Sequence, residues 1–262
     1  MSNQAIYKFS GKNEPALQVG SGTQVRIHTK DCFSNQLRKP EDKMAALDWD
    51  RINPATGPIY VKEAEPGDIL KVTIHKIELN EKGTVGILGG ILKDVHSKII
   101  PIRDGKAIFN DKTEIPVQPM IGVIGVAPAN DEINTGTPGR HGGNMDNTMI
   151  GEGAVLYFNV EVPGALFACG DVHAVMGDGE IGVFALEIPA AIDVALEVIK
   201  SKSVEGPMLE NKEYWSVIES AEDLEDAVQH ATENMFRFLK ERMDLEGAEI
   251  AMLMSLVGQL QF

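Results

Sequence analysis

The chain has 262 residues, 43% of them hydrophobic, which is enough to bury a substantial core, and its 39 acidic against 24 basic residues give a formal net charge of −15. This charge repels nucleic-acid phosphates and anionic lipid surfaces, so neither nucleic acid nor membrane is expected as a partner. No stretch has the roughly 20 apolar residues of a membrane-spanning helix, and the first residues lack the pattern of a signal peptide, so we expect a cytoplasmic protein.

Strands are predicted through the first two thirds of the chain, where short stretches alternate apolar and polar residues between glycine-rich turns. Residues 23–31 and 67–79 alternate in this way. The short run 121–127 is continuously apolar, which is typical of a strand buried on both faces. These three segments indicate the beginning of a β domain.

Four further strands are predicted in the middle of the chain. Residues 154–162 and 165–171 are joined by a Pro-Gly pair at 163–164, which indicates a hairpin. The apolar stretch 181–188 is expected to be a strand, and 190–201 repeats its apolar residues with a period of two, as a strand does.

Helical spacing replaces this pattern near Ser220, which we expect to cap a helix over 221–243. A second helix is predicted over 248–257, ending at Gly258. The chain shows no internal repeat and no clear linker. We therefore expect one domain, 1–262, with a β core over about residues 5–200 and a helical C-terminal part over about 220–258.

The stretch "GDVHAVMGDGE", residues 170–180, gathers titratable groups. Asp171 and His173 are two residues apart, so both face one side if the strand continues that far, as two ligands of one metal must. Asp178 and Glu180 add carboxylates that repel unless a cation or proton relieves them. Alone, the pattern also fits a solvated acidic turn, but apolar stretches on both sides favour a turn over the core. The order of residues excludes an EF-hand loop.

A glycine-rich loop, "TGTPGRHGGNMDN" at 135–147, forms the second candidate site. Its backbone amides at Gly142 and Gly143 could approach a substrate closely or donate to a developing oxyanion. Asn144 and Asp146, with His141, supply polar side chains. A tight surface turn in which Asp146 caps a backbone amide is the plainer alternative.

The stretch "IHTKDC" places Asp31 where a strand gives way to a loop, whereas His28 within the strand is a weaker candidate. Cys32 and Cys169 each lie beside a candidate acid. Neighbouring carboxylates raise the pKa of a thiol, so we expect two free, buried, inert cysteines rather than a nucleophile. Common motifs of serine hydrolases and of nucleotide-binding proteins are missing from the sequence.

Four segments resemble the acetamidase/formamidase family in the same order. They are "NPATGPIYVKEAEPGDIL" (53–70), "PMIGVIGVAP" (119–128), "GGNMDN" (142–147) and "GALFACGDVHAVMGDGEIG" (164–182). The resemblance implies a mainly β fold with α/β additions, built as a β-sandwich or compressed barrel, that forms a homodimer or higher homo-oligomer. It implies hydrolysis of small aliphatic amides, of the formamide or acetamide class, to carboxylate and ammonia, with zinc or calcium as cofactor.

The resemblance also implies roles for individual residues. The metal-site candidates are Asp31, Asp146, Asp171 and His173. Glu180 is the expected proton-transfer residue, with Asp178 as a neighbouring catalytic candidate and Glu187 ranked second. The Gly142 and Gly143 amides, or Asn144, are expected to bind the substrate oxygen. Chains of the family usually continue into a further strand beyond the segment that ends here at Phe262, so we expect either that the sequence is truncated or that a closing strand is absent.

Two other functions fit the same acids. A non-enzymatic, calcium-binding β-sandwich of the carbohydrate-binding type would need exposed aromatic platforms, and this chain has 6% aromatic residues and only two tryptophans, Trp49 and Trp215. The same hydrolytic chemistry could also act on a carbamate, a urea-like compound or a cyclic amide.

Overall fold

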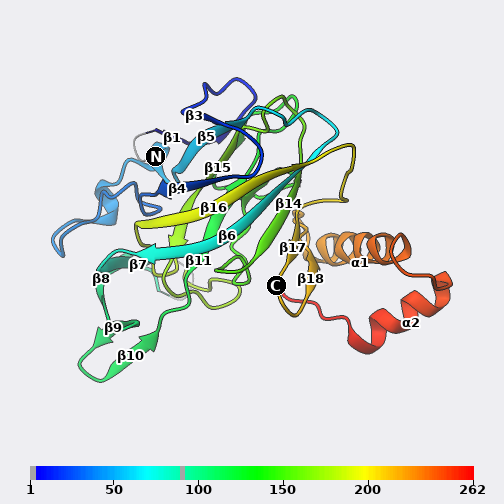
Figure 1. Ribbon diagram of the computed structural model, residues 1–262. Helices are drawn as coiled ribbons and strands as arrows, with labels where there is room; N and C mark the ends of the chain where they lie inside the picture. The colour runs from blue at the N-terminus through cyan, green and yellow to red at the C-terminus, as the bar shows by residue number, and fades with distance from the viewer. Residues whose placement is uncertain (1–3, 89–91) are drawn as a thin grey trace.

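Most strands belong to two six-stranded sheets in the computed structural model, which describes residues 4–88 and 92–262 (Figure 1). The first sheet contains β1 (Ala5–Ile6), β3 (Leu17–Val19), β5 (Ala55–Val61), β11 (Met120–Gly125), β13 (Gly142–Asn144) and β15 (Phe167–His173). The second contains β4 (Thr23–His28), β6 (Ile69–Leu79), β14 (Val155–Asn159), β16 (Ala190–Ile199), β17 (Met208–Glu210) and β18 (Trp215–Val217).

The two sheets share one hydrophobic core. The order of the first sheet is β1-β5-β15-β11-β13, with β3 beside β5, and that of the second is β18-β17-β14-β6-β16-β4. Alternate residues of the second sheet, such as Val72 and Val194, are fully buried in the same cluster as Ile124 and Phe167 of the first. A mainly β sandwich with a small helical part is therefore confirmed.

Two smaller sheets complete the β structure. An arm of four strands, ordered β10-β9-β8-β7, projects from the sandwich at the lower left of Figure 1. It consists of β7 (Lys82–Ile87), β8 (His96–Arg103), β9 (Lys106–Asn110) and β10 (Thr113–Pro116). The other sheet pairs β2 (Lys8–Phe9) with β12 (Ile133–Asn134). Two 3-10 turns lie at Met44–Ala46 and Trp49–Arg51.

Two helices follow the sheets, α1 (Leu224–Lys240) and α2 (Gly247–Val257). The predicted N-cap at Ser220 was wrong: Asp223 is the extended residue before the helix, and acids in the first turn favour a start there through the helix dipole. The predicted end at Gly258 is confirmed. No helix within the described residues is both long and apolar enough to cross a membrane.

The predicted hairpin of 154–162 with 165–171 was wrong. Strand β14 pairs with β6 and β17, whereas β15 pairs with β5 and β11, so the segments belong to different sheets. Ala165 and Leu166 both adopt left-handed backbone angles, with φ of 58° and 55°. This corner turns the chain from one sheet to the other, which a Pro-Gly pattern does not distinguish from a hairpin turn.

The predicted strand over 181–188 was also wrong. Only single β-bridges form there, at Val183 and at Glu187. The carbonyl of Glu180 accepts a hydrogen bond from the N–H of Val183, so the chain turns where an extended strand was expected. The strands expected near 23, 67, 121, 154, 165 and 190 are confirmed as β4, β6, β11, β14, β15 and β16.

Candidate functional site

Strand β15 carries the first two candidate ligands at its C-terminal end. Asp171 and His173 are buried, with 2% and 1% of their surfaces exposed. Asp171 has a φ of 54°, so the strand bends there and the simple alternation of faces does not hold. The two side chains nevertheless meet, since His173 Nε2 lies 3.6 Å from Asp171 Oδ2. A left-handed backbone at an aspartate costs free energy and often occurs at functional sites.

Glu187 reaches the same place because the chain folds back along β15. The N–H of Ala174 donates to the carbonyl of Leu186, and the N–H of Ile188 donates to that of Val172. This pairing sets Glu187 opposite His173. Glu187 Oε1 accepts a hydrogen bond from the Ala185 N–H at 3.0 Å, while Oε2 lies 3.3 Å from His173 Nε2. Glu187 is 1% exposed, so the residue ranked second from the sequence lies at the centre of the site.

Asp146 enters from the other side, two residues after β13, which pairs with β11. Its Oδ1 lies 3.9 Å from His173 Nε2, and its Oδ2 accepts a hydrogen bond from Asn144 Nδ2 at 2.8 Å. Asp146 also has a left-handed backbone, with a φ of 41°. Asn144 therefore fixes one oxygen of Asp146 and leaves the other facing His173.

Glu180 comes from the loop between β15 and the returning segment, with a φ of 40°. Its carboxylate belongs to a set with His173 and Glu187 whose potential ligand atoms lie within 4.8 Å of one another. Asp146, Asp171 and His173 form a second such set. We call Asp146, Asp171, His173, Glu180 and Glu187 together the acid–histidine cluster.

Burial and the charges of neighbouring groups shift the pKa values of Asp146, His173, Glu180 and Glu187. Burial, together with the charge of Asp171, raises the pKa of Asp146 to about 7 and that of Glu187 to about 8. Burial also raises the pKa of Glu180. Burial would lower the pKa of His173, but the carboxylates of Glu187 and Asp171 raise it well above the usual value. A bound cation would relieve this crowding of negative charge.

Several polar atoms of the cluster are buried without a hydrogen-bond partner among the described residues. These are Asp146 Oδ1, Asp171 Oδ1, His173 Nδ1 and Glu187 Oε2. Buried carboxylate oxygens are costly unless they are paired or ligate a metal. Carboxylate oxygens and an imidazole nitrogen are ligands that divalent ions accept in proteins. The residues present therefore fit a divalent metal ion.

The carboxylates of Asp146 and Asp171 fit side by side because residue 122 is a glycine and has no side chain. A Cβ built on Gly122 would lie 2.5 Å from Asp146 Oδ1 and 2.8 Å from Asp171 Oδ2. The Gly122→Ala variant is expected to displace both carboxylates and to weaken metal binding by about 10-fold or more, the scale seen when groups around a metal are disturbed. Titration of the metal-free protein with zinc measures this effect.

Gly177→Ala is the matched control, because a Cβ at Gly177 meets no atom within 4 Å. Equal zinc affinity in the Gly122→Ala and Gly177→Ala proteins would show that the space beside Gly122 does not serve a metal.

Three residues expected at the site, Asp31, Asp178 and Gly142, make hydrogen bonds outside the acid–histidine cluster. Asp31 is buried and its pKa is raised by burial to about 6, but its Oδ1 accepts a hydrogen bond from the Asn35 N–H at 2.6 Å and it joins none of the close sets. Asp178 is exposed and accepts a hydrogen bond from Thr148 Oγ1 at 2.7 Å. The Gly142 N–H donates to the carbonyl of Gly139 at 2.9 Å.

Both cysteines are buried, as expected. Cys32 lies beside the acid–histidine cluster. Its sulfur forms a set with Asp171 and Glu187 whose potential ligand atoms are within 4.8 Å of one another. Burial and these carboxylates raise the pKa of Cys32 well above the usual value. Burial alone raises the pKa of Cys169 to about 12. Neither thiol is poised to form a nucleophilic thiolate at neutral pH.

Replacement of Cys169 by alanine is expected to leave most of the amide-hydrolysing rate that the resemblance implies. Its side chain is fully buried in the shared core, so the change should lower the free energy of unfolding by about 1 kcal/mol. Urea unfolding and the specific rate measure the two effects. A folded, metal-replete Cys169→Ala protein without activity would instead identify a thiol mechanism.

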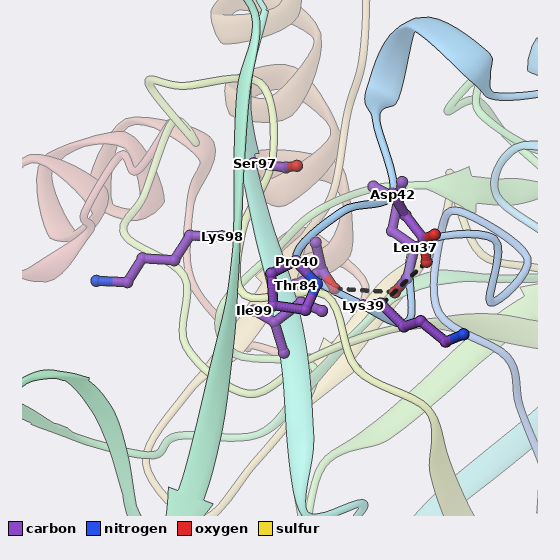
Figure 2. A pocket seen from close by; sticks show the side chains of 8 residues that line it. All are labelled: Leu37, Lys39, Pro40, Asp42, Thr84, Ser97, Lys98 and Ile99. Carbon is purple, nitrogen blue, oxygen red and sulfur yellow. Dashed lines mark hydrogen bonds between the residues drawn. The ribbon is translucent and has the colours of Figure 1, made fainter.

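A hollow of about 190 Å³ lies between residues 37–42 and strands β7 and β8 (Figure 2). Figure 2 shows the ammonium groups of Lys39 and Lys98 pointing away from each other. Thr84 Oγ1 donates to the carbonyl of Leu37 across it. The hollow shares no lining residue with the acid–histidine cluster, so it lies outside the candidate site.

Comparison with known proteins connects this arrangement to one family. A model of the Acetamidase/Formamidase family matches residues 7–135 and 127–258. A crystal structure of a recombinant predicted acetamidase/formamidase from the thermophile Thermoanaerobacter tengcongensis is 49% identical, with a TM-score of 0.93 over 96% of this chain and 86% of that chain. A crystal structure of an acetamidase from Bacillus halodurans is 39% identical, with a TM-score of 0.95 over 99% and 92% of the two chains.

The acetamidase of Mycolicibacterium smegmatis is 26% identical, in a match that covers 71% of this chain and 63% of the relative. The chain thus spans less than two thirds of the length of the curated relatives that it matches.

Proposed function

Because this chain belongs to the acetamidase/formamidase family, we propose that it is an amidase that hydrolyses small aliphatic amides with the help of a divalent metal ion. The products would be a carboxylate and ammonia, as in the formamide and acetamide class. The main observation behind the proposal is that the Nε2 atom of the buried His173 lies within 3.9 Å of carboxylate oxygens of Asp146, Asp171 and Glu187.

Asp146, Asp171 and His173 would hold the ion, with Glu187 beside them. When bound, the ion would supply Lewis acidity and lower the pKa of nearby water. Zinc accepts an imidazole together with carboxylates, whereas calcium takes oxygen ligands, so His173 favours zinc over calcium. Asp31 is close enough to Asp171 for the two carboxylates to repel each other. We therefore propose that Asp31 adds negative charge near the metal and is not itself a ligand.

Glu180 is the best candidate for proton transfer. Glu187 is fixed by the Ala185 N–H and by His173 and is almost fully buried, so its carboxylate is not free to reach a substrate. Glu180 is half-buried, and its pKa is raised by burial, which makes it a stronger base. It would take a proton from water and give a proton to the departing nitrogen.

Asn144 is the candidate that would bind the substrate oxygen. One N–H of its side-chain amide donates to Asp146, and the group has a second N–H. The Gly142 amide already donates to Gly139, and Gly143 is paired with Ile124 in the first sheet, so we favour the Asn144 side chain over both backbone amides. A donor aimed at the oxygen on which charge develops stabilises the transition state.

The packing of Trp215 disfavours the non-enzymatic carbohydrate-binding alternative. Its ring stacks on Tyr157 at 5.5 Å and lies against Phe238 at 5.1 Å between ring centroids. Trp215 thus packs between β14 and α1, which occupies part of its ring, while 43% of its surface stays exposed.

Ammonia release from formamide, acetamide, a carbamate and urea, together with release of the ring-opened amino acid from a cyclic amide, tests the function. We expect turnover of the simple amides by the zinc-loaded protein, and little by Asp171→Asn protein purified in the same way. Turnover of urea or the carbamate alone would contradict the proposed substrate class.

We include in the proposal a cytoplasmic homodimer or larger homo-oligomer. Exposed apolar side chains on α2 and after it, such as Leu256 at 80% and Phe262 at 70% exposure, favour assembly. Light scattering measures the molar mass, and the mass of one chain would contradict this part of the proposal.

A further inference from the structure

An apolar cavity of about 340 Å³, open to solvent on one side, adjoins the acid–histidine cluster at Glu180. One wall comes from the projecting arm, with Val85 on β7, Ile100 on β8 and Ile115 on β10. The other wall is the loop that follows β15, including Met176 and Leu186.

Glu180 connects the cavity with the cluster. Glu180 is one of the residues that line the cavity, and its carboxylate lies in the close set with His173 and Glu187. Apart from Glu180 and Asp178, every residue that lines the cavity is apolar or glycine. A molecule that reacts beside Glu180 can therefore place an apolar group in this cavity.

The size of the cavity exceeds what formamide or acetamide needs. Each molecule of liquid water occupies about 30 Å³, and acetamide, with four heavy atoms, needs about two or three such volumes. Ligand pockets of proteins are mostly apolar, with a few polar groups at one end, and begin at about 300 Å³. The cavity of about 340 Å³ beside a single reactive carboxylate matches this description.

We propose that this cavity binds the acyl group of the substrate, so that the preferred substrates are primary aliphatic amides with four or five carbon atoms. The inference rests on the proposed amidase function. Because that reaction releases ammonia, the nitrogen carries no substituent, and the apolar group must be attached to the carbonyl carbon. With the carbonyl beside the cluster, the alkyl chain extends past Glu180 between Val85 and Leu186.

The test compares kcat/KM for formamide, acetamide, isobutyramide and pentanamide. Each buried methylene is expected to raise kcat/KM about 4-fold, which is the scale of burying one such group. Val85→Phe fills the cavity from a half-buried position outside the cluster. This variant should lose the gain with pentanamide, by about 10-fold or more, and should keep its rate with acetamide.

Val95→Phe is the matched control, since Val95 is 47% exposed and does not line the cavity. If Val85→Phe does not fold, Ile115→Phe fills the same cavity from β10. Equal rate losses for all amides in Val85→Phe, with or without a changed molar mass, would overturn the proposal. A changed mass would show that a second copy of the chain covers the cavity.

Ligand-detected NMR with pentanamide separates this inference from the proposed function. Binding to the wild type but not to Val85→Phe, without turnover of any amide, would support the cavity and refute the amidase. Turnover of acetamide, with pentanamide neither bound nor hydrolysed faster, would refute the inference alone.

Discussion

Replacement of Asp171 by asparagine is expected to remove most of the bound metal and, with it, most of the amide turnover. Asp171 belongs to two of the three close sets of potential ligands, and it is buried beside His173. Disturbing groups outside the ligands commonly costs 10- to 100-fold in metal affinity, so loss of a ligand should cost more than about 100-fold. Elemental analysis and ammonia release measure the two effects.

The fold is expected to survive this change. Asparagine has nearly the shape of aspartate, and removal of one buried negative charge reduces the repulsion from Asp146 and Glu187. The melting temperature of the metal-free Asp171→Asn protein should therefore equal or exceed that of the metal-free wild type. A variant that keeps its metal and its rate would exclude Asp171 as a ligand.

Replacement of Glu180 by glutamine is expected to reduce turnover by about 100-fold or more while the metal content stays unchanged. This is the usual scale for the loss of a general acid or base. Glutamine keeps the size of the side chain and cannot take up the proton. Steady-state rates with acetamide, measured on protein with verified metal content, give the result.

Asp178→Asn is the control for this prediction. Asp178 lies two residues earlier on the same loop, but it is exposed and bonded to Thr148. We expect its rate to stay close to that of the wild type. A large loss in Asp178→Asn together with a small loss in Glu180→Gln would transfer the proton-transfer role to Asp178.

The core of the fold could be predicted because its strands carry their own periodic signal. Strands β6 and β16 alternate apolar residues over long stretches, and their register follows from one buried face. The connection after β14 could not be predicted, since the left-handed backbone at Ala165 and Leu166 directs the chain to the other sheet. The projecting arm gave no clear pattern because many of its residues are exposed on both faces.

The candidate site could be predicted in part. Asp171 and His173 were recognisable as neighbouring polar residues at a strand end, although the left-handed backbone at Asp171 breaks the alternation expected from their spacing, and Asp146 was recognisable from its glycine-rich loop. Glu187 received a lower rank because it lies in an apolar stretch expected to be a plain strand, whereas its pairing opposite His173 depends on the turn between them. The presence of the charged Glu187 within the apolar stretch 181–188 was the feature of the sequence that could have indicated its place in the site. The same loop places Asp178 at the surface, where it is exposed and bonded to Thr148.

The most direct test follows one protein through removal and return of its metal. Ammonia release from acetamide is measured on the purified protein, after chelation and dialysis, and after zinc is restored. We expect activity to disappear with the metal, to return with about one ion per chain, and to stay absent in Asp171→Asn protein treated in the same way. Full activity in protein shown by elemental analysis to be metal-free would contradict the central claim.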